Sequence, residues 1–125
     1  MEIHAGSERP GEARPGGAEF SGQVWITELL AAGEPGGVHV LRVQFEPGAR
    51  TAWHSHPGGQ VLHVLSGVGT VATAGGDRRE IRAGDTVRAA AGERHWHGAT
   101  ADRAMTHLAI QPTGTEWCEK VVDDG

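Results

Sequence analysis

Residues 48–67 read GARTAWHSHPGGQVLHVLSG, and the two histidines in this stretch, His54 and His56, are separated by a single residue. In an extended strand, alternate side chains point to the same face, so both imidazoles are expected to face one space. Gln60 follows a Pro-Gly-Gly turn and opens an apolar run, Val61–Leu65, that is typical of a buried strand. We expect the turn to bring Gln60 back beside the two histidines.

A second cluster with the same spacing lies at residues 92–97, which read GERHWH and carry His95 and His97. Neutral imidazoles are good ligands for first-row transition metals. Two His-x-His pairs and a glutamine on short strands therefore predict a metal site rather than polar side chains on a solvated strand.

The composition indicates one β-rich domain. The chain has 125 residues, of which 20 are glycine and 6 are proline, and no long stretch shows helical periodicity. Short apolar runs separated by Gly, Pro and Asp predict an all-β sandwich or barrel.

The net charge of −5 argues against a nucleic-acid partner, which would need a basic face. The single cysteine, Cys118, excludes an intrachain disulfide and suits a reducing compartment.

The order of apolar runs predicts about nine or ten short strands. They are expected near residues 23–29, 38–45, 51–56, 61–65, 70–74, 80–82, 86–89 and 104–111, with a further strand that holds His95. Residues 117–122 are expected to add an edge strand or to pack as a tail. Residues 1–18, rich in Gly, Pro, Glu and Arg, are predicted to form a flexible arm before a folded domain at 19–125. The N-terminus lacks the apolar core of a signal peptide and no run is long enough to span a membrane, so we expect a cytoplasmic location without a membrane partner.

The two histidine clusters resemble the two cupin motifs. Residues 48–67 match G-x5-H-x-H-x3-E-x6-G, and residues 84–99 match G-x5-P-x-G-x2-H-x3-N. Three positions depart from these motifs: Gln60 stands where the first has Glu, and Ala90 and Ala99 stand where the second has Pro and Asn. The resemblance implies an all-β, single-domain cupin, which is a small jelly-roll barrel.

A more specific similarity is to the small manganese-dependent cupin hydroxynitrile lyases of bacteria. It is carried by FEPGARTAWH at 45–54, GERHWHGA at 92–99 and MTHLAIQ at 105–111. It implies that His97 and His107 lie in the pocket beside the metal without binding it. The expected metal ligands are His54, His56, Gln60 and His95.

All four expected ligands are neutral, so a divalent ion keeps its full charge and acts as a stronger Lewis acid than with Glu at position 60. The charge count also disfavours a higher oxidation state, and with it oxygen activation. Mn²⁺ is the metal that the resemblance implies, whereas the ligand types alone also suit iron, nickel, cobalt or zinc.

These features predict a lyase that cleaves and forms cyanohydrins, with a small aldehyde or cyanohydrin as the substrate. His107 or His97 would take the hydroxyl proton and return a proton to cyanide, and His107 is the favoured base. The expected pocket walls are Leu41, Val43, Leu62, Val64, Met105, Ala109 and Gln111. Strand alternation directs His63 away from the site, and His39 is expected to have a structural role.

The alternatives to a lyase are a metal-dependent dioxygenase or other oxidoreductase, and a non-catalytic small-molecule-binding cupin. A homodimer or homotetramer is expected.

Overall fold

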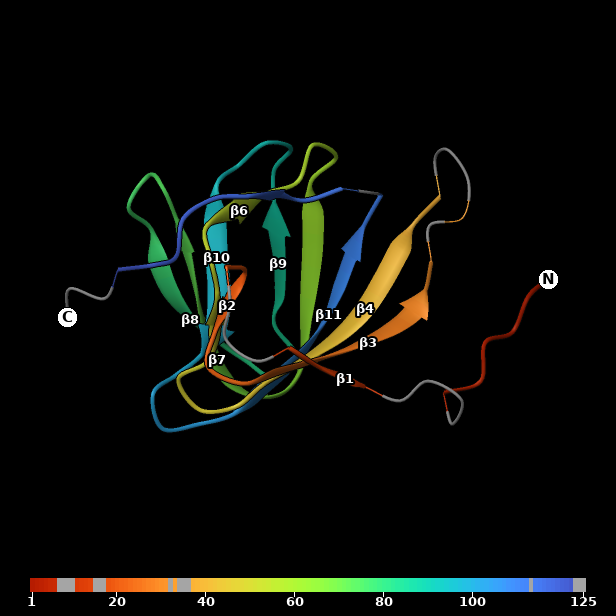
Figure 1. Ribbon diagram of the computed structural model, residues 1–125, viewed down its shortest axis with the longest axis horizontal. Helices are drawn as coiled ribbons and strands as arrows, with labels where there is room; N and C mark the ends of the chain where they lie inside the picture. Colours follow the sequence, from red (N-terminus) through yellow and green to blue (C-terminus); the bar gives the residue numbers. More distant parts are fainter. Residues whose placement is uncertain (7–10, 15–17, 32, 34–36, 113, 123–125) are drawn as a thin grey trace.

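The computed structural model describes residues 1–6, 11–14, 18–31, 33, 37–112 and 114–122 (Figure 1). Twelve strands and no α-helix are found among these residues, which confirms the all-β prediction. The strands are β1 Glu12–Arg14, β2 Phe20–Ser21, β3 Val24–Leu30, β4 His39–Phe45, β5 Arg50–Thr51, β6 His54–Ser55, β7 Gln60–Thr73, β8 Arg78–Arg82, β9 Thr86–Ala89, β10 His95–Ala99, β11 Met105–Gln111 and β12 Glu116–Trp117. No helix in the described part of the chain has the length and hydropathy needed to cross a membrane.

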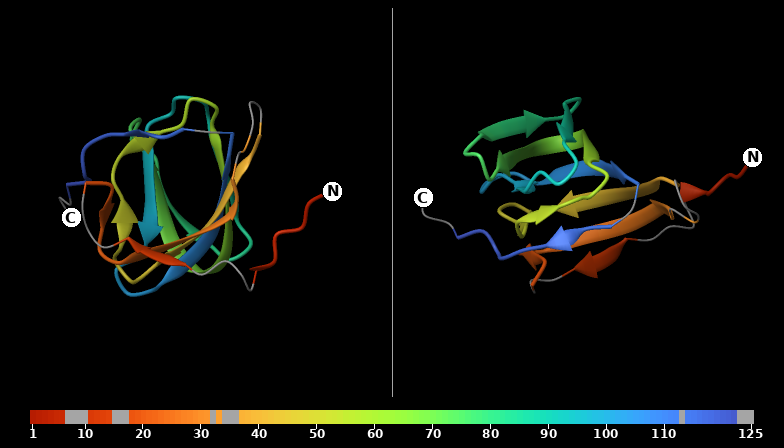
Figure 2. Two further views of the ribbon diagram at one scale, coloured as in Figure 1. Left: turned by 45° about the vertical axis from the view of Figure 1, so that its right-hand side comes forward. Right: turned by 90° about the horizontal axis from the view of Figure 1, so that it is seen from above.

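The strands form one antiparallel sheet that curls around an interior (Figure 2). Its main path runs β1-β3-β4-β11-β7-β10-β5-β2, and β8 and β9 both pair with β7. The first half of β7 pairs with β11 and β9, whereas its second half pairs with β10 and β8. This one strand therefore joins the two walls of the barrel.

The two strands expected at residues 61–65 and 70–74 are in fact the single strand β7, so this division was wrong. Gly67 explains the difference, because its φ of +80° lets the strand bend without breaking. A side chain at Gly67 would collide with the backbone of Ala104. A glycine that reads as a strand end in the sequence is here the bend between the two walls.

The apolar core fills the barrel from several strands. Fully or almost fully buried members include Val24, Phe45, Leu62, Val64, Met105 and Ala109. They lie at alternate positions of β3, β4, β7 and β11, so each strand places one face inside. Burying a side chain of this size contributes about 1.5–3 kcal/mol. Strand β7 of this core pairs with β10, which in turn pairs with β6, so the core supports the strands that carry His54, His95 and His97.

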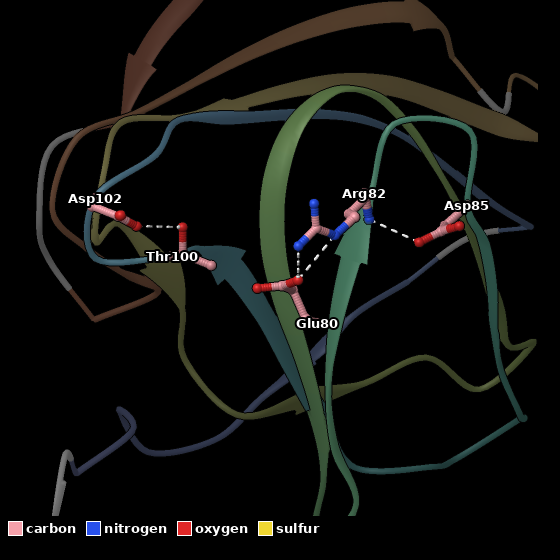
Figure 3. A network of polar contacts seen from close by, with 5 residues as sticks. All are labelled: Glu80, Arg82, Asp85, Thr100 and Asp102. Carbon is pink, nitrogen blue, oxygen red and sulfur yellow. Dashed lines mark hydrogen bonds and ion pairs between the residues drawn. The ribbon is translucent and has the colours of Figure 1, made fainter.

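The strand turns are held by short polar contacts on the surface. The backbone N–H of Arg82 donates to the Asp85 carboxylate at 2.8 Å, and the Arg82 guanidinium pairs with Glu80 at 2.6 Å (Figure 3). On another turn, the hydroxyl of Thr100 donates to Asp102 at 3.2 Å (Figure 3). These side chains are exposed, so each pair contributes little stability.

The two ends of the chain differ from their predicted form. Part of the predicted arm, at residues 7–10 and 15–17, lies outside the described residues, but β1 within it pairs with β3 from Glu12–Ile26 to Arg14–Val24. At residues 117–122, expected to form an edge strand or a packed tail, the only strand is β12, Glu116–Trp117, which begins one residue earlier and pairs with β6.

Candidate functional site

Three buried histidines and Gln60 converge inside one end of the barrel. His54 on β6 lies opposite His95 on β10 in the strand register, and their ring centroids are 4.4 Å apart. The ring of His56 lies 5.0 Å from that of His54 and 5.6 Å from that of His95. Gln60 opens β7 and reaches the same space, since its amide oxygen lies 3.0 Å from Nε2 of His95. The spacing of the first motif does bring Gln60 back beside the histidines.

Three of these imidazoles are oriented in the same way by backbone carbonyls. Nδ1 of His54, His56 and His95 donates to the carbonyl oxygens of Ala52, Gly114 and Glu93, at 2.9, 2.9 and 2.8 Å. A carbonyl can only accept, so Nδ1 carries the hydrogen in each ring and Nε2 keeps its lone pair. A second hydrogen bond of this kind is how proteins orient a histidine that binds a metal.

The contact between His95 and Gln60 tests whether a cation fits. Gln60 donates its Nε2–H to Oε1 of Gln111 at 2.8 Å, which turns its own Oε1 toward His95. With Nδ1 of His95 already donating, two lone pairs then face one another at 3.0 Å. Nε2 of His56 is also buried without a hydrogen-bond partner. Repulsion between acceptors and an unpaired buried nitrogen are both costly, and a bound cation relieves both. The residues present therefore fit a metal ion.

His97 lies closer to the ligand cluster than the motif alone indicates. Among the His, Cys, Asp and Glu side chains of the described residues, one group lies close enough together to share one metal ion. It is formed by His54, His95 and His97, whose ring nitrogens lie within 4.8 Å of one another. This grouping contains His97 and not His56. Nδ1 of His97 is 3.0 Å from Nε2 of His107, while Nε2 of His97 has no hydrogen-bond partner. His97 therefore presents a free nitrogen next to the cluster.

His107 supports His97 from inside the barrel. Its side chain is completely buried on β11, and it does not line the cavity beside the cluster. Phe45 packs against both rings, with centroid distances of 5.9 Å to His97 and 5.3 Å to His107. The two histidines form one hydrogen-bonded pair, in which His97 alone lines the cavity.

Burial keeps this cluster uncharged. Burial, followed by the nearby His95, lowers the pKa of His54 to about 3, and burial lowers the pKa of His107 to about 4. Burial and the neighbouring His107 hold the pKa of His97 well below its ordinary value. The pKa values of His56 and His95 are also lowered, mainly by burial. All five imidazoles are thus neutral near pH 7, the state in which they can bind a metal or accept a proton.

A cavity of about 70 Å³ opens beside the cluster. Of the expected wall residues, Leu41, Val43, Ala109 and Gln111 line it. Leu62, Val64 and Met105 do not: they are buried in the apolar core. Strand alternation correctly predicts that these three side chains point into the barrel. The interior contains both the apolar core and the cavity, and alternation alone does not tell which of the two an inward side chain faces.

The remaining cavity walls were not anticipated from the sequence. They are Phe20, Ile26, Thr51, Thr115 and Trp117. Alternation within the predicted strand at 23–29 would have placed Ile26 inside. Nothing local to residues 115 and 117 indicates that they return to the first histidine motif, about 60 residues away in the chain.

The family model described as "Cupin domain" matches residues 41–111 of this chain. The chain belongs to the cupin family. Over 130 aligned residues it is 47% identical to (R)-mandelonitrile lyase of Granulicella tundricola, covering 99% of this chain and 97% of that protein. The resemblance to the small cupin hydroxynitrile lyases is thereby confirmed.

Solved structures place the fold in the same family. A cupin-like protein from Thermotoga maritima is 38% identical, with a TM-score of 0.81 and coverage of 85% of this chain and 84% of that one. A predicted oxalate decarboxylase from the same organism is 22% identical, with a TM-score of 0.76 and coverage of 94% of this chain and all of that one. The second likeness concerns the fold alone.

Two further histidines, His39 and His63, and two of the tryptophans, Trp53 and Trp96, lie outside the cluster. His63 bonds to the Thr86 hydroxyl at 2.8 Å, and His39 bonds to the Glu28 carboxylate at 2.8 Å. Trp96, between His95 and His97 on β10, faces the other way, where the guanidinium groups of Arg50 and Arg78 lie 5.3 and 5.2 Å from its ring centre. Trp53 similarly carries Arg94 over its ring at 5.1 Å. Cys118 is exposed and does not line the cavity.

Proposed function

We propose that this cupin is a metal-dependent lyase that cleaves cyanohydrins to an aldehyde and hydrogen cyanide, and forms them in reverse. The observation that carries this proposal is the cavity itself. It brings a neutral three-histidine and glutamine cluster next to a buried histidine pair, so a cation site and a proton carrier face the same space. The identity to (R)-mandelonitrile lyase supports the same reaction class.

We propose that His54, His56, Gln60 and His95 hold the metal, with Mn²⁺ as the native ion. Three imidazole nitrogens and one amide oxygen form a mixed donor set that Mn²⁺ and other divalent transition metals accept. When bound, the ion would supply Lewis acidity toward the oxygen of the substrate. Gln111 keeps the Gln60 amide oxygen turned inward, since it accepts the Gln60 Nε2–H at 2.8 Å.

The proton is assigned to the His97–His107 pair. Nε2 of His97 is unpaired and His97 lines the cavity, so this nitrogen is the one that can take the hydroxyl proton. As the proton leaves, the C–C bond to the nitrile breaks, its electron pair goes to cyanide, and the carbonyl forms. His97 then returns the proton to cyanide. Burial lowers the pKa of His97 and so keeps it neutral, which leaves Nε2 able to accept a proton.

His107 holds His97 in place for these transfers. For Nε2 of neutral His97 to accept a proton, Nδ1 must carry the ring hydrogen, and it then donates to Nε2 of His107, 3.0 Å away. Two coupled imidazoles share one hydrogen in this contact, so they act as a unit. His107, which the sequence favoured as the base, is proposed to act through His97 because only His97 lines the cavity.

The cavity walls favour an uncharged substrate. Phe20, Ile26, Leu41 and Val43 make one side apolar, and none of the described lining residues is Arg, Lys, Asp or Glu. A carboxylate substrate would find no ionic partner there, and burying it unpaired is costly. A small aromatic or aliphatic cyanohydrin meets the chemistry of these walls.

The proposal is tested with the purified protein as isolated. Metal content is measured first, followed by cleavage of mandelonitrile with oxygen consumption recorded in the same sample. We expect about one metal ion per chain and benzaldehyde release without oxygen uptake. Turnover that requires oxygen would replace the proposal by the oxidoreductase alternative, and a metal-replete protein without turnover would favour the binding-protein alternative.

We also propose a cytoplasmic location and a homodimer or homotetramer. The single cysteine supports a reducing compartment. Among the described strands, β1 and β2 end the main path of the sheet, so each has one edge without a neighbouring strand. An open strand edge supports pairing of copies through it.

A further inference from the structure

The C-terminal segment, residues 114–119, crosses the end of the barrel where the histidines lie (Figure 1). β12 pairs with β6 so that Trp117 lies opposite His54 in the register. Further backbone bonds flank it: the Cys118 N–H donates to the Trp53 carbonyl at 2.8 Å, and the Trp53 N–H donates to the Glu119 carbonyl at 3.0 Å. The backbone itself therefore docks the segment, independently of the indole of Trp117.

The same segment both orients a proposed ligand and closes the cavity. The Gly114 carbonyl accepts from Nδ1 of His56 at 2.9 Å, and the Thr115 hydroxyl lies 3.3 Å from that nitrogen. Thr115 and Trp117 line the cavity. The segment is thus part of the site and not a tail packed on its surface.

Trp117 forms the partition between the cavity and solvent. Its ring centroid lies 4.9 Å from that of His54, tilted by 39°, and 5.5 Å from that of Phe20 in an edge contact. It lines the cavity, yet 37% of its surface is exposed. One side of the indole therefore faces the interior while another faces water, so its removal would extend the cavity outward.

We propose that Trp117 is the residue that sets the size of substrate this cupin accepts. The inference rests on the proposed function, since it assumes that the organic part of a cyanohydrin or aldehyde occupies the cavity. With the reacting carbon toward His54 and His97, that organic group lies against Trp117 and Phe20. A fused or extended ring then collides with the indole, whereas a single ring or short chain fits. Trp117 is a specificity-determining residue in this assignment, not a proton carrier.

The test uses Trp117→Ala and Trp117→Phe, with Trp25→Ala as the matched control. Trp25 is a similarly exposed tryptophan, at 39%, but it does not line this cavity. For each protein we measure metal content, thermal unfolding, and kcat/KM for the cyanohydrins of benzaldehyde and 2-naphthaldehyde. We expect Trp117→Ala to raise the naphthyl-to-phenyl ratio of kcat/KM by about tenfold or more, a usual effect of pocket size on selectivity. Trp117→Phe should shift it less in the same direction, and Trp25→Ala should leave it unchanged.

Binding without reaction separates this inference from the proposed function. The affinities of benzyl alcohol and 2-naphthalenemethanol, measured by ligand-observed NMR, should shift in the same direction in Trp117→Ala. If the wild-type protein lacks lyase activity but this affinity ratio shifts, the function fails and the size limit stands. If a folded Trp117 variant leaves both the kcat/KM ratio and the affinity ratio unchanged, the inference is overturned. This holds also when activity falls equally for both substrates, because such a loss reflects the changed surroundings of His54 and not the size of the cavity. If Trp117→Ala does not fold, Trp117→Phe decides in the same way.

Discussion

The neutral state of His107 predicts how acid destabilises the metal-free protein. His107 is completely buried, and burial lowers its pKa to about 4 from the ordinary value of 6.5, which applies in the unfolded chain. Between these values the unfolded chain binds more protons than the folded one, so the free energy of unfolding falls as the pH falls. The stability that neutral His107 contributes is fully present above pH 6.5 and is lost as the pH falls toward 4. From about pH 7.5 to about pH 5, these two pKa values give a loss of about 2 kcal/mol from His107.

The perturbation is His107→Gln, which keeps a polar side chain facing His97 but cannot take up a proton. Urea unfolding of the chelator-treated proteins at the two pH values gives the pH-dependent part of the free energy of unfolding. Between the two pH values, we expect the free energy of unfolding to fall by about 2 kcal/mol less in the variant than in the wild type. Val64→Ala is the control, because Val64 lies opposite His107 in the β7–β11 register and its truncation should lower stability equally at both pH values. The same pH dependence in wild type and His107→Gln would refute the reasoning.

The remaining predictions concern the metal and the reaction. His54→Ala or His95→Ala should abolish stoichiometric metal binding while the barrel stays folded, as seen by metal analysis and circular dichroism, and full occupancy in both variants would contradict the ligand assignment. Gln60→Glu should keep or tighten the metal but lower cyanohydrin turnover, because an anionic ligand weakens the Lewis acid; equal or faster turnover at equal metal loading would show that the charge argument is wrong. His97→Ala and His107→Ala should each retain the metal and lose on the order of 10²–10⁴ in kcat, and the double variant should lose far less than the product of the two losses. Metal loss in His97→Ala would instead place His97 among the ligands, and near wild-type cleavage by metal-replete His107→Ala would remove His107 from the reaction.

The all-β class and the convergence of the histidines were predictable because both depend on local rules. Strand alternation turns His54 and His56, and likewise His95 and His97, to one face whatever the rest of the chain does. The Pro-Gly-Gly turn then returns Gln60 to the same region. The bend at Gly67 was not predictable in this way, because a glycine in a strand and a glycine that ends one read alike until the partner strands are known.

Details of the site beyond the motifs depend on the tertiary structure. The carbonyls that orient the imidazoles include both local and distant ones. Those of Ala52 and Glu93 lie two residues from their histidines, whereas that of Gly114 comes from 58 residues beyond His56. The arrangement of His97 in front of His107 depends on how β10 and β11 face each other across the barrel.

The sequence by itself therefore determined the class of fold, the family, and which histidines converge with Gln60 on one site. The tertiary structure decided which inward side chains line the cavity and which fill the core, so Leu41 and Val43 face the cavity while Leu62 and Met105 are packed away from it. It also decided that Trp117 returns to cover His54. The physical reason is range: alternation and turn chemistry act over a few residues, whereas the shape of a cavity is set by contacts between strands far apart in the chain.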